Sequence, residues 1–113
     1  MNVEKATYSY KAVNEAIKKV KAQNWTTTKK ASHSALATEV KGLFQFCYEK
    51  TDCLLFDPDF EPYIIEYCRA AYNYKNYTKK ELDIKLGFCK RFLQRELTSI
   101  YNMMLSGEVN TTD

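Results

Sequence analysis

The amino-acid sequence predicts an all-α fold: a single domain of four mostly antiparallel helices, the last of which is long. Apolar residues recur in steps of three and four in four separate stretches, and this spacing places them on one face of a helix. Residues that interrupt helices are rare, because the 113-residue chain contains only three Gly and two Pro. Hydrophobic residues make up 45% of the chain, which is enough for one packed core at this length.

The first half of the chain is expected to form helices at about residues 9–23 and 32–49. The apolar face of the first would carry Tyr10, Val13, Ile17 and Val20. The apolar face of the second would carry Leu36, Val40, Leu43 and Cys47. Between them, residues 24–30 contain Trp25 and three successive Thr, which favour extended backbone over helix. We therefore predict a loop there.

A third helix is expected at about residues 59–74. Pro58 disfavours helical backbone at Asp57, so the residues before it should form a connector. Asp59 suits the N-cap, and Pro62 fits the first turn, where a backbone donor is not needed. The inward face would carry Phe60, Ile64, Cys68 and Ala71, with Ile65 and Tyr72 beside them.

The fourth helix is expected at about residues 78–106. Thr78 and Glu81 match the capping box, and Gly107 suits the C-terminal cap. One apolar stripe follows the whole helix: Leu82, Leu86, Cys89, Leu93, Leu97, Ile100 and Met104. A helix of about 28 residues is about 42 Å long, so we expect part of it to project toward a partner. The polar tail, 107–113, is expected to be frayed.

Residues that carry chemistry form no recognisable catalytic or metal site, so we expect neither enzymatic activity nor a cofactor. His33 lies in a polar stretch at the start of the second helix, where a capping or surface role is expected. The cysteines lack the close C-x-x-C pairs of zinc sites and are expected to be free thiols: Cys47, Cys53, Cys68 and Cys89. The chain shows neither an apolar leader nor a run of about 18 apolar residues, which favours a cytoplasmic protein without a membrane span.

Charge is unevenly distributed along the chain. Residues 67–95 contain eight basic and two acidic side chains, whereas residues 52–66 contain five acidic side chains and no basic one. Such zones can pair between neighbouring subunits or steer an acidic partner. A solvated helix surface explains them equally well.

Residues 57–74, DPDFEPYIIEYCRAAYNY, followed by a capped helix through residues 92–97, FLQREL, resemble the small helical head–tail connector (adaptor) proteins of tailed bacteriophages. The likeness covers residues 36–105. It implies a structural protein that forms a ring below the portal and joins capsid to tail. The partners would be copies of itself, the portal and tail proteins, with DNA only as the contents of the channel. The protein would then be part of the virion.

On this interpretation, subunits of a closed ring meet head-to-tail through complementary faces. The end of the last helix would dock on a neighbour or the portal through Leu97, Tyr101, Met104 and Leu105. Trp25 would form a second contact. Charged contacts would involve Arg69, Lys90, Arg91 and Arg95 on one face and Asp57, Asp59 and Glu61 on the other. Deleting residues 100–113 should then abolish assembly and leave the domain folded.

Two other functions fit the sequence. A small helical inhibitor, immunity-type or regulatory protein would act by binding one protein target, and a one-to-one complex would identify it. A nucleic-acid-binding domain would use residues 67–95, and its affinity would fall steeply with salt concentration.

Overall fold

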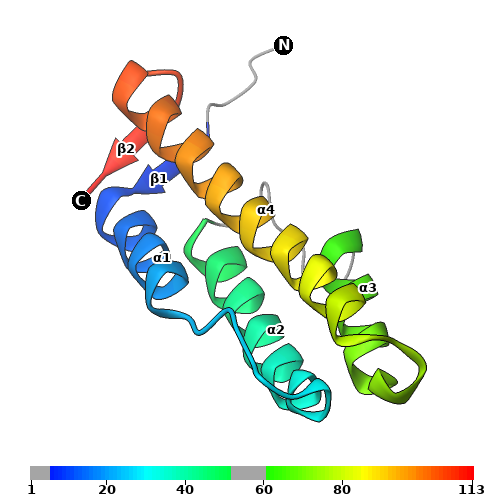
Figure 1. Cartoon of the computed structure of the whole chain (residues 1–113). Coiled ribbons are helices and arrows are strands. Elements are labelled where there is room, and N and C mark those ends of the chain that lie inside the picture. Colours follow the sequence, from blue (N-terminus) through cyan, green and yellow to red (C-terminus); the bar gives the residue numbers. More distant parts are fainter. Residues whose placement is uncertain (1–5, 52–60) are drawn as a thin grey trace.

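The computed structural model describes residues 6–51 and 61–113. It confirms the predicted all-α class (Figure 1). The helices of the described part are α1 (Tyr10–Ala22), α2 (His33–Lys50), α3 (Pro62–Tyr72) and α4 (Lys79–Ser106). Short 3₁₀ turns lie at Lys30–Ser32 and Tyr74–Asn76, and two three-residue strands, β1 (Thr7–Ser9) and β2 (Asn110–Thr112), lie near the ends of the chain.

The long helix α4 runs along the whole molecule, and α1 and α3 pack directly beside it (Figure 1). α1 lies antiparallel against its C-terminal half, where the rings of Tyr10 and Tyr101 meet with centroids 6.1 Å apart. α3 lies antiparallel against its N-terminal half, where Lys85 Nζ is 2.6 Å from Glu66 Oε1. α2 packs against both α1 and α3. The molecule is consequently elongated, with principal extents of 50 × 30 × 18 Å.

The core follows the predicted helix faces closely. All seven residues of the predicted α4 stripe are buried, from Leu82 at the first turn to Met104 near the last. Burial of α4 therefore continues along its full length, and the prediction that part of the helix projects toward a partner is wrong. Deleting residues 100–113 would remove Ile100 and Met104 from the core, so the expectation that the domain stays folded after this deletion is not supported either.

The ends of α4 are fixed as the sequence predicts. The Glu81 backbone N–H donates to Thr78 Oγ1 at 3.1 Å, and the Thr78 backbone N–H donates to Glu81 Oε1 at 3.0 Å. These two bonds form the capping box. At the other end Gly107 adopts a φ of 81°, a left-handed conformation that residues with a Cβ rarely take.

The start of α3 differs from the prediction. The helix begins at Pro62, with Glu61 at the N-cap position and no side-chain cap bond. Pro is well suited to the first helical position, because its φ is already helical and no donor is lost there. The predicted cap, Asp59, lies outside the described residues. The helix also ends earlier, at Tyr72, because the chain turns into the 3₁₀ segment Tyr74–Asn76.

The C-terminal tail is not frayed, contrary to prediction. β2 pairs with β1 in parallel, with Tyr8 opposite Thr111. The Asn110 N–H also donates to the Ala6 carbonyl oxygen at 2.9 Å. Three-residue strands are too short for a periodic signal, and this pairing joins segments about a hundred residues apart. The pattern of the sequence therefore could not show it.

Candidate interaction surface

A group of apolar side chains on α3 and α4 is left exposed by the core. Ile84 and Phe88 lie four residues apart on α4, which places them on one face, and they are 49% and 45% exposed. Tyr63, in the first turn of α3, is 36% exposed and stacks near Phe88 with ring centroids 6.0 Å apart. Arg91 and Arg95 continue the same side of α4. We call these five residues the α3/α4 surface.

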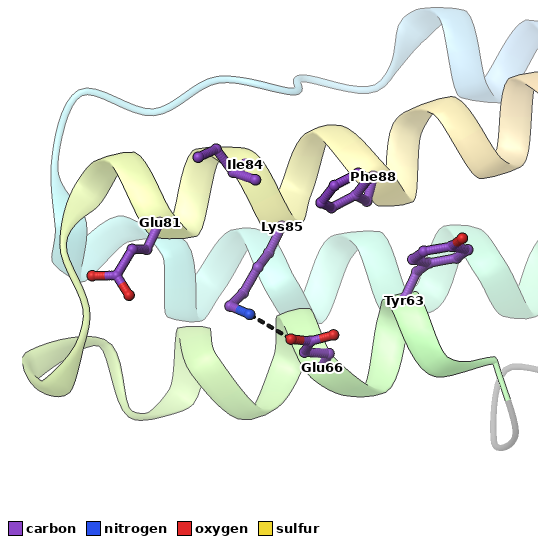
Figure 2. A pocket seen from close by; sticks show the side chains of 6 residues that line it. All are labelled: Tyr63, Glu66, Glu81, Ile84, Lys85 and Phe88. Carbon is purple, nitrogen blue, oxygen red and sulfur yellow. Dashed lines mark hydrogen bonds and ion pairs between the residues drawn. The ribbon is translucent and has the colours of Figure 1, made fainter.

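The surface contains a first hollow between α3 and α4 (Figure 2). Its lining residues are Tyr63, Glu66, Glu81, Ile84, Lys85 and Phe88. Lys85 reaches across from α4 to Glu66 on α3, at a Nζ–Oε1 distance of 2.6 Å (Figure 2). The hollow has a volume of about 180 Å³, below the roughly 300–1,000 Å³ of typical small-molecule sites. It is suited to a single side chain of a partner.

A second, broader hollow of about 600 Å³ continues along α4 from the first. Its lining residues are Tyr63, Phe88, Arg91, Phe92, Gln94, Arg95 and Thr98. The Arg91 guanidinium lies 4.9 Å from the ring centroid of Phe88, and that of Arg95 lies 5.9 Å from the ring centroid of Phe92. These aromatic faces favour cations. Because Tyr63 and Phe88 line both hollows, the two are adjacent, and we call them together the α3/α4 groove.

The two ends of the groove differ in charge. At the first hollow the Lys85–Glu66 pair balances itself. At the second hollow Arg91 forms no ion pair with another described residue, and the ion pair that Arg95 forms within the described part is a loose one with Glu96, at 3.8 Å. Burial raises the pKa of the nearby Glu61 carboxyl, although Arg95 opposes that rise. The second hollow is therefore the more positive end.

The structure brings together only some of the charged residues that the sequence analysis assigned to an interface. Arg91 and Arg95 lie on the α3/α4 surface and are exposed, whereas Lys90 is half-buried on α4 and lines neither hollow. Arg69 is exposed on α3 and lines neither hollow. Glu61 is half-buried at the start of α3. Asp57 and Asp59 lie outside the described residues.

Most of the apolar residues nominated for docking belong to the core instead. Leu97 and Met104 are buried, so neither can meet a partner in the folded chain. Tyr101 packs edge-to-face on Tyr10. Trp25 is half-buried, and its indole Nε1 donates to the Val20 carbonyl oxygen at 3.0 Å, which folds the loop back onto α1. Of this group, Leu105 alone is largely exposed, at 63%.

The sequence analysis missed the apolar part of the surface, namely Tyr63, Ile84 and Phe88. A signal was present: Ile84 and Phe88 form a second pair four residues apart on α4, displaced from the long stripe that fills the core. One amphipathic helix needs one apolar face. An additional apolar pair outside that face is therefore available to a partner.

A buried polar cluster overturns the expectation that His33 caps a helix or lies at the surface. The His33 ring is fully buried, with Nδ1 3.0 Å from the Tyr67 hydroxyl and Nε2 3.2 Å from Asp83 Oδ1. The Nε2–Oδ1 contact is close but lacks the alignment of a good hydrogen bond. Asp83 also accepts from Lys79 Nζ at 2.6 Å. The cluster thus joins the starts of α2 and α4 to the middle of α3.

The protonation of this cluster follows from its surroundings. Burial lowers the pKa of the His33 imidazole, and Asp83 opposes this effect, whereas Lys79 adds to it. The ring is therefore neutral near pH 7. Because a carboxylate only accepts, the ring proton belongs on Nε2, and Tyr67 donates to Nδ1.

The described cysteines, Cys47, Cys68 and Cys89, are free and buried. Burial raises the pKa of Cys47 and of Cys89 to about 12, so these thiols stay protonated and unreactive. Cys53 lies outside the described residues. Within residues 6–51 and 61–113, no three His, Cys, Asp or Glu side chains are placed to hold a metal ion. No described helix is both long and apolar enough to cross a membrane.

Comparison with known proteins gave no match: neither family models nor curated proteins nor solved structures match this chain.

Proposed function

We propose that this protein is a non-enzymatic assembly protein that binds other protein subunits through the α3/α4 surface. The observation that carries the proposal is the exposure of Ile84 and Phe88 beside Tyr63, Arg91 and Arg95. Aromatic and Arg side chains are the types most enriched at protein–protein interfaces, and they supply most of the residues that dominate binding energy.

The physical basis is the apolar area that folding leaves in water. A fully buried Ile or Phe side chain contributes about 1.5–3 kcal/mol relative to an exposed one. Ile84 and Phe88 are each about half exposed, so burial against a partner would add roughly half of that for each. Together they would add about 1.5–3 kcal/mol to an association.

The specific form that we propose is a subunit of a phage head–tail connector ring below the portal. The resemblance of residues 57–74 and 92–97 to that family supports this form. A closed ring needs two different faces on each subunit. Leu105, exposed at the far end of α4 from Ile84, is a candidate for the second face.

The native mass of the purified chain over a concentration series, with electron microscopy of any large species, tests the connector form. A closed ring of many copies supports it. A monomer that forms a one-to-one complex with a soluble protein would instead favour the inhibitor or immunity-type function. A monomer that also remains single in the presence of portal protein would refute the connector form.

Two matched variants test whether copies meet through the α3/α4 surface. Ile84→Ser removes an exposed apolar side chain from the surface. Ile65→Ser makes the same change at a residue of α3 that is 36% exposed and lines neither hollow. Dissociation of the ring by the first change alone would place the contact between copies on this surface. If both variants keep the ring, the copies meet elsewhere and the α3/α4 surface is free for another protein.

A further inference from the structure

The groove on the α3/α4 surface is long enough for about two turns of a partner helix. Its two hollows share Tyr63 and Phe88 and follow α4 from Ile84 to Arg95. At about 1.5 Å per residue, Ile84 and Arg91 are separated by roughly 10 Å along the helix axis. Side chains seven residues apart on a partner helix span the same distance. Helices that dock in grooves use anchors at such spacings.

The charge of the groove identifies the chemistry of the occupant. The first hollow has no free cation, because Lys85 pairs with Glu66 and the other charged residue of its lining is the acidic Glu81. The second hollow presents Arg91, which has no carboxylate partner among the described residues, and Arg95, which is paired only loosely. An occupant would therefore place apolar side chains over the first hollow and carboxylates over the second.

A nucleic acid fits this pattern less well than an acidic protein segment. A single strand needs cations along the whole path of its backbone, with aromatic rings for the bases. Glu66 and Glu81 line the first hollow and would repel phosphates there. The cations are concentrated at one end of the groove only.

A second copy of the chain does not supply a matching helix from its described part. α1 carries four Lys against one Glu, and α4 is also basic. α2 carries two Glu against two Lys, and α3 carries one Glu against one Arg. None of these helices carries a net negative charge.

We infer, building on the proposed function, that the α3/α4 groove binds an acidic amphipathic helix of a different protein. Its apolar anchors occupy the hollow beside Ile84 and Phe88, and its carboxylates pair with Arg91 and Arg95. Specificity comes from the Arg end, and the apolar end supplies the buried area. Because the Arg side chains are exposed, the charged part of the interaction is weakened by salt.

The test uses two fluorescent helical peptides with the same apolar positions, one with Glu and one with Lys at the flanking positions. Binding to the full chain is measured by fluorescence anisotropy at low and moderate salt. A single-stranded oligothymidine of similar length serves as the nucleic-acid probe. The Glu peptide is expected to bind at least tenfold more tightly than the Lys peptide and the oligothymidine.

Three variants then test whether the Glu peptide binds in the groove. Arg95→Glu should cost the Glu peptide about tenfold in affinity, and Phe88→Ser should weaken it similarly. Lys75→Glu, which makes the same charge change at an exposed residue outside both hollows, should have a smaller effect. Circular dichroism confirms that each variant is folded.

Several outcomes would overturn the inference. These are equal binding of the two peptides, tighter binding of the oligothymidine, and equal losses in Arg95→Glu and Lys75→Glu. A ring that dissociates in Ile84→Ser would show that a second copy occupies the groove. That last result would overturn the inference yet support the proposed assembly function, so the two failures can be told apart.

Discussion

Replacing Tyr67 with Phe removes one hydroxyl from the centre of the fold and leaves His33 Nδ1 without its donor. Both side chains are fully buried, and their polar atoms are 3.0 Å apart. A buried acceptor that loses its partner costs about 1–3 kcal/mol. For a domain of this size, 1 kcal/mol lowers the melting temperature by roughly 3–6 °C. We therefore expect a decrease in Tm of roughly 3–18 °C.

Urea denaturation and thermal melting followed by circular dichroism measure this change. Tyr101→Phe is the matched control, because Tyr101 is only half-buried. It should alter the free energy of unfolding by less than about 0.5 kcal/mol. A loss below that level in Tyr67→Phe would show that the hydroxyl does not stabilise the cluster.

The same cluster sets the sign of a pH effect on stability. Burial lowers the pKa of His33 in the folded protein, so the unfolded chain takes up this proton first as the pH falls. The stabilisation is complete above about pH 6.5, the ordinary pKa of His. It declines as the pH falls from there toward the folded-state pKa. The Asp83 carboxylate resists this loss and Lys79 promotes it.

Comparison of the wild type with His33→Leu isolates this contribution from that of the carboxyl groups. The pH dependence of the unfolding free energy between about pH 5 and 6.5 should be steeper in the wild type. Parallel curves for the two proteins would contradict the assignment of the effect to His33.

Three further predictions concern the ends of α4. Thr78→Ala removes one half of the capping box with Glu81 and should cost about 0.5–2 kcal/mol in urea unfolding. Gly107→Ala meets no steric obstacle but forces a Cβ into the left-handed region, so it should cost about 1–2 kcal/mol in the same assay. Deleting residues 108–113 removes β2 and uncovers Tyr8, so it should lower Tm; an unchanged Tm would indicate that the tail is frayed.

The parts of the fold that the sequence predicted are those with a long or chemically specific signal. The apolar stripe of α4 repeats over the whole helix, and the Thr78–Glu81 pair satisfies two backbone donors in one local motif. Elements that depend on contacts between distant residues were not predictable in the same way. The β1–β2 pair and the burial of His33 beside Tyr67 both join segments that no local pattern relates.

Of the candidate interaction surface, the sequence analysis named the charged residues and missed the exposed apolar ones. The excess of basic residues between 67 and 95 drew attention to Arg91 and Arg95, which line the second hollow in the structure. Leu97 and Met104 were assigned to an interface because the C-terminal part of α4 was expected to project beyond the rest of the domain. The position of α1 could not be deduced from periodicity. An apolar face shows that a helix packs against something, but it does not identify the partner element. In the structure α1 covers this part of α4.

The division of apolar residues on α4 links the fold to the proposed function. The apolar stripe from Leu82 to Met104 is buried in the core. Ile84 and Phe88 lie outside it, and folding leaves about half of each side chain in water. Apolar side chains that gather at the surface in this way are a liability unless a partner covers them. Since these two lie beside Arg91 and Arg95 in the groove, substitutions there should weaken binding more than they weaken folding.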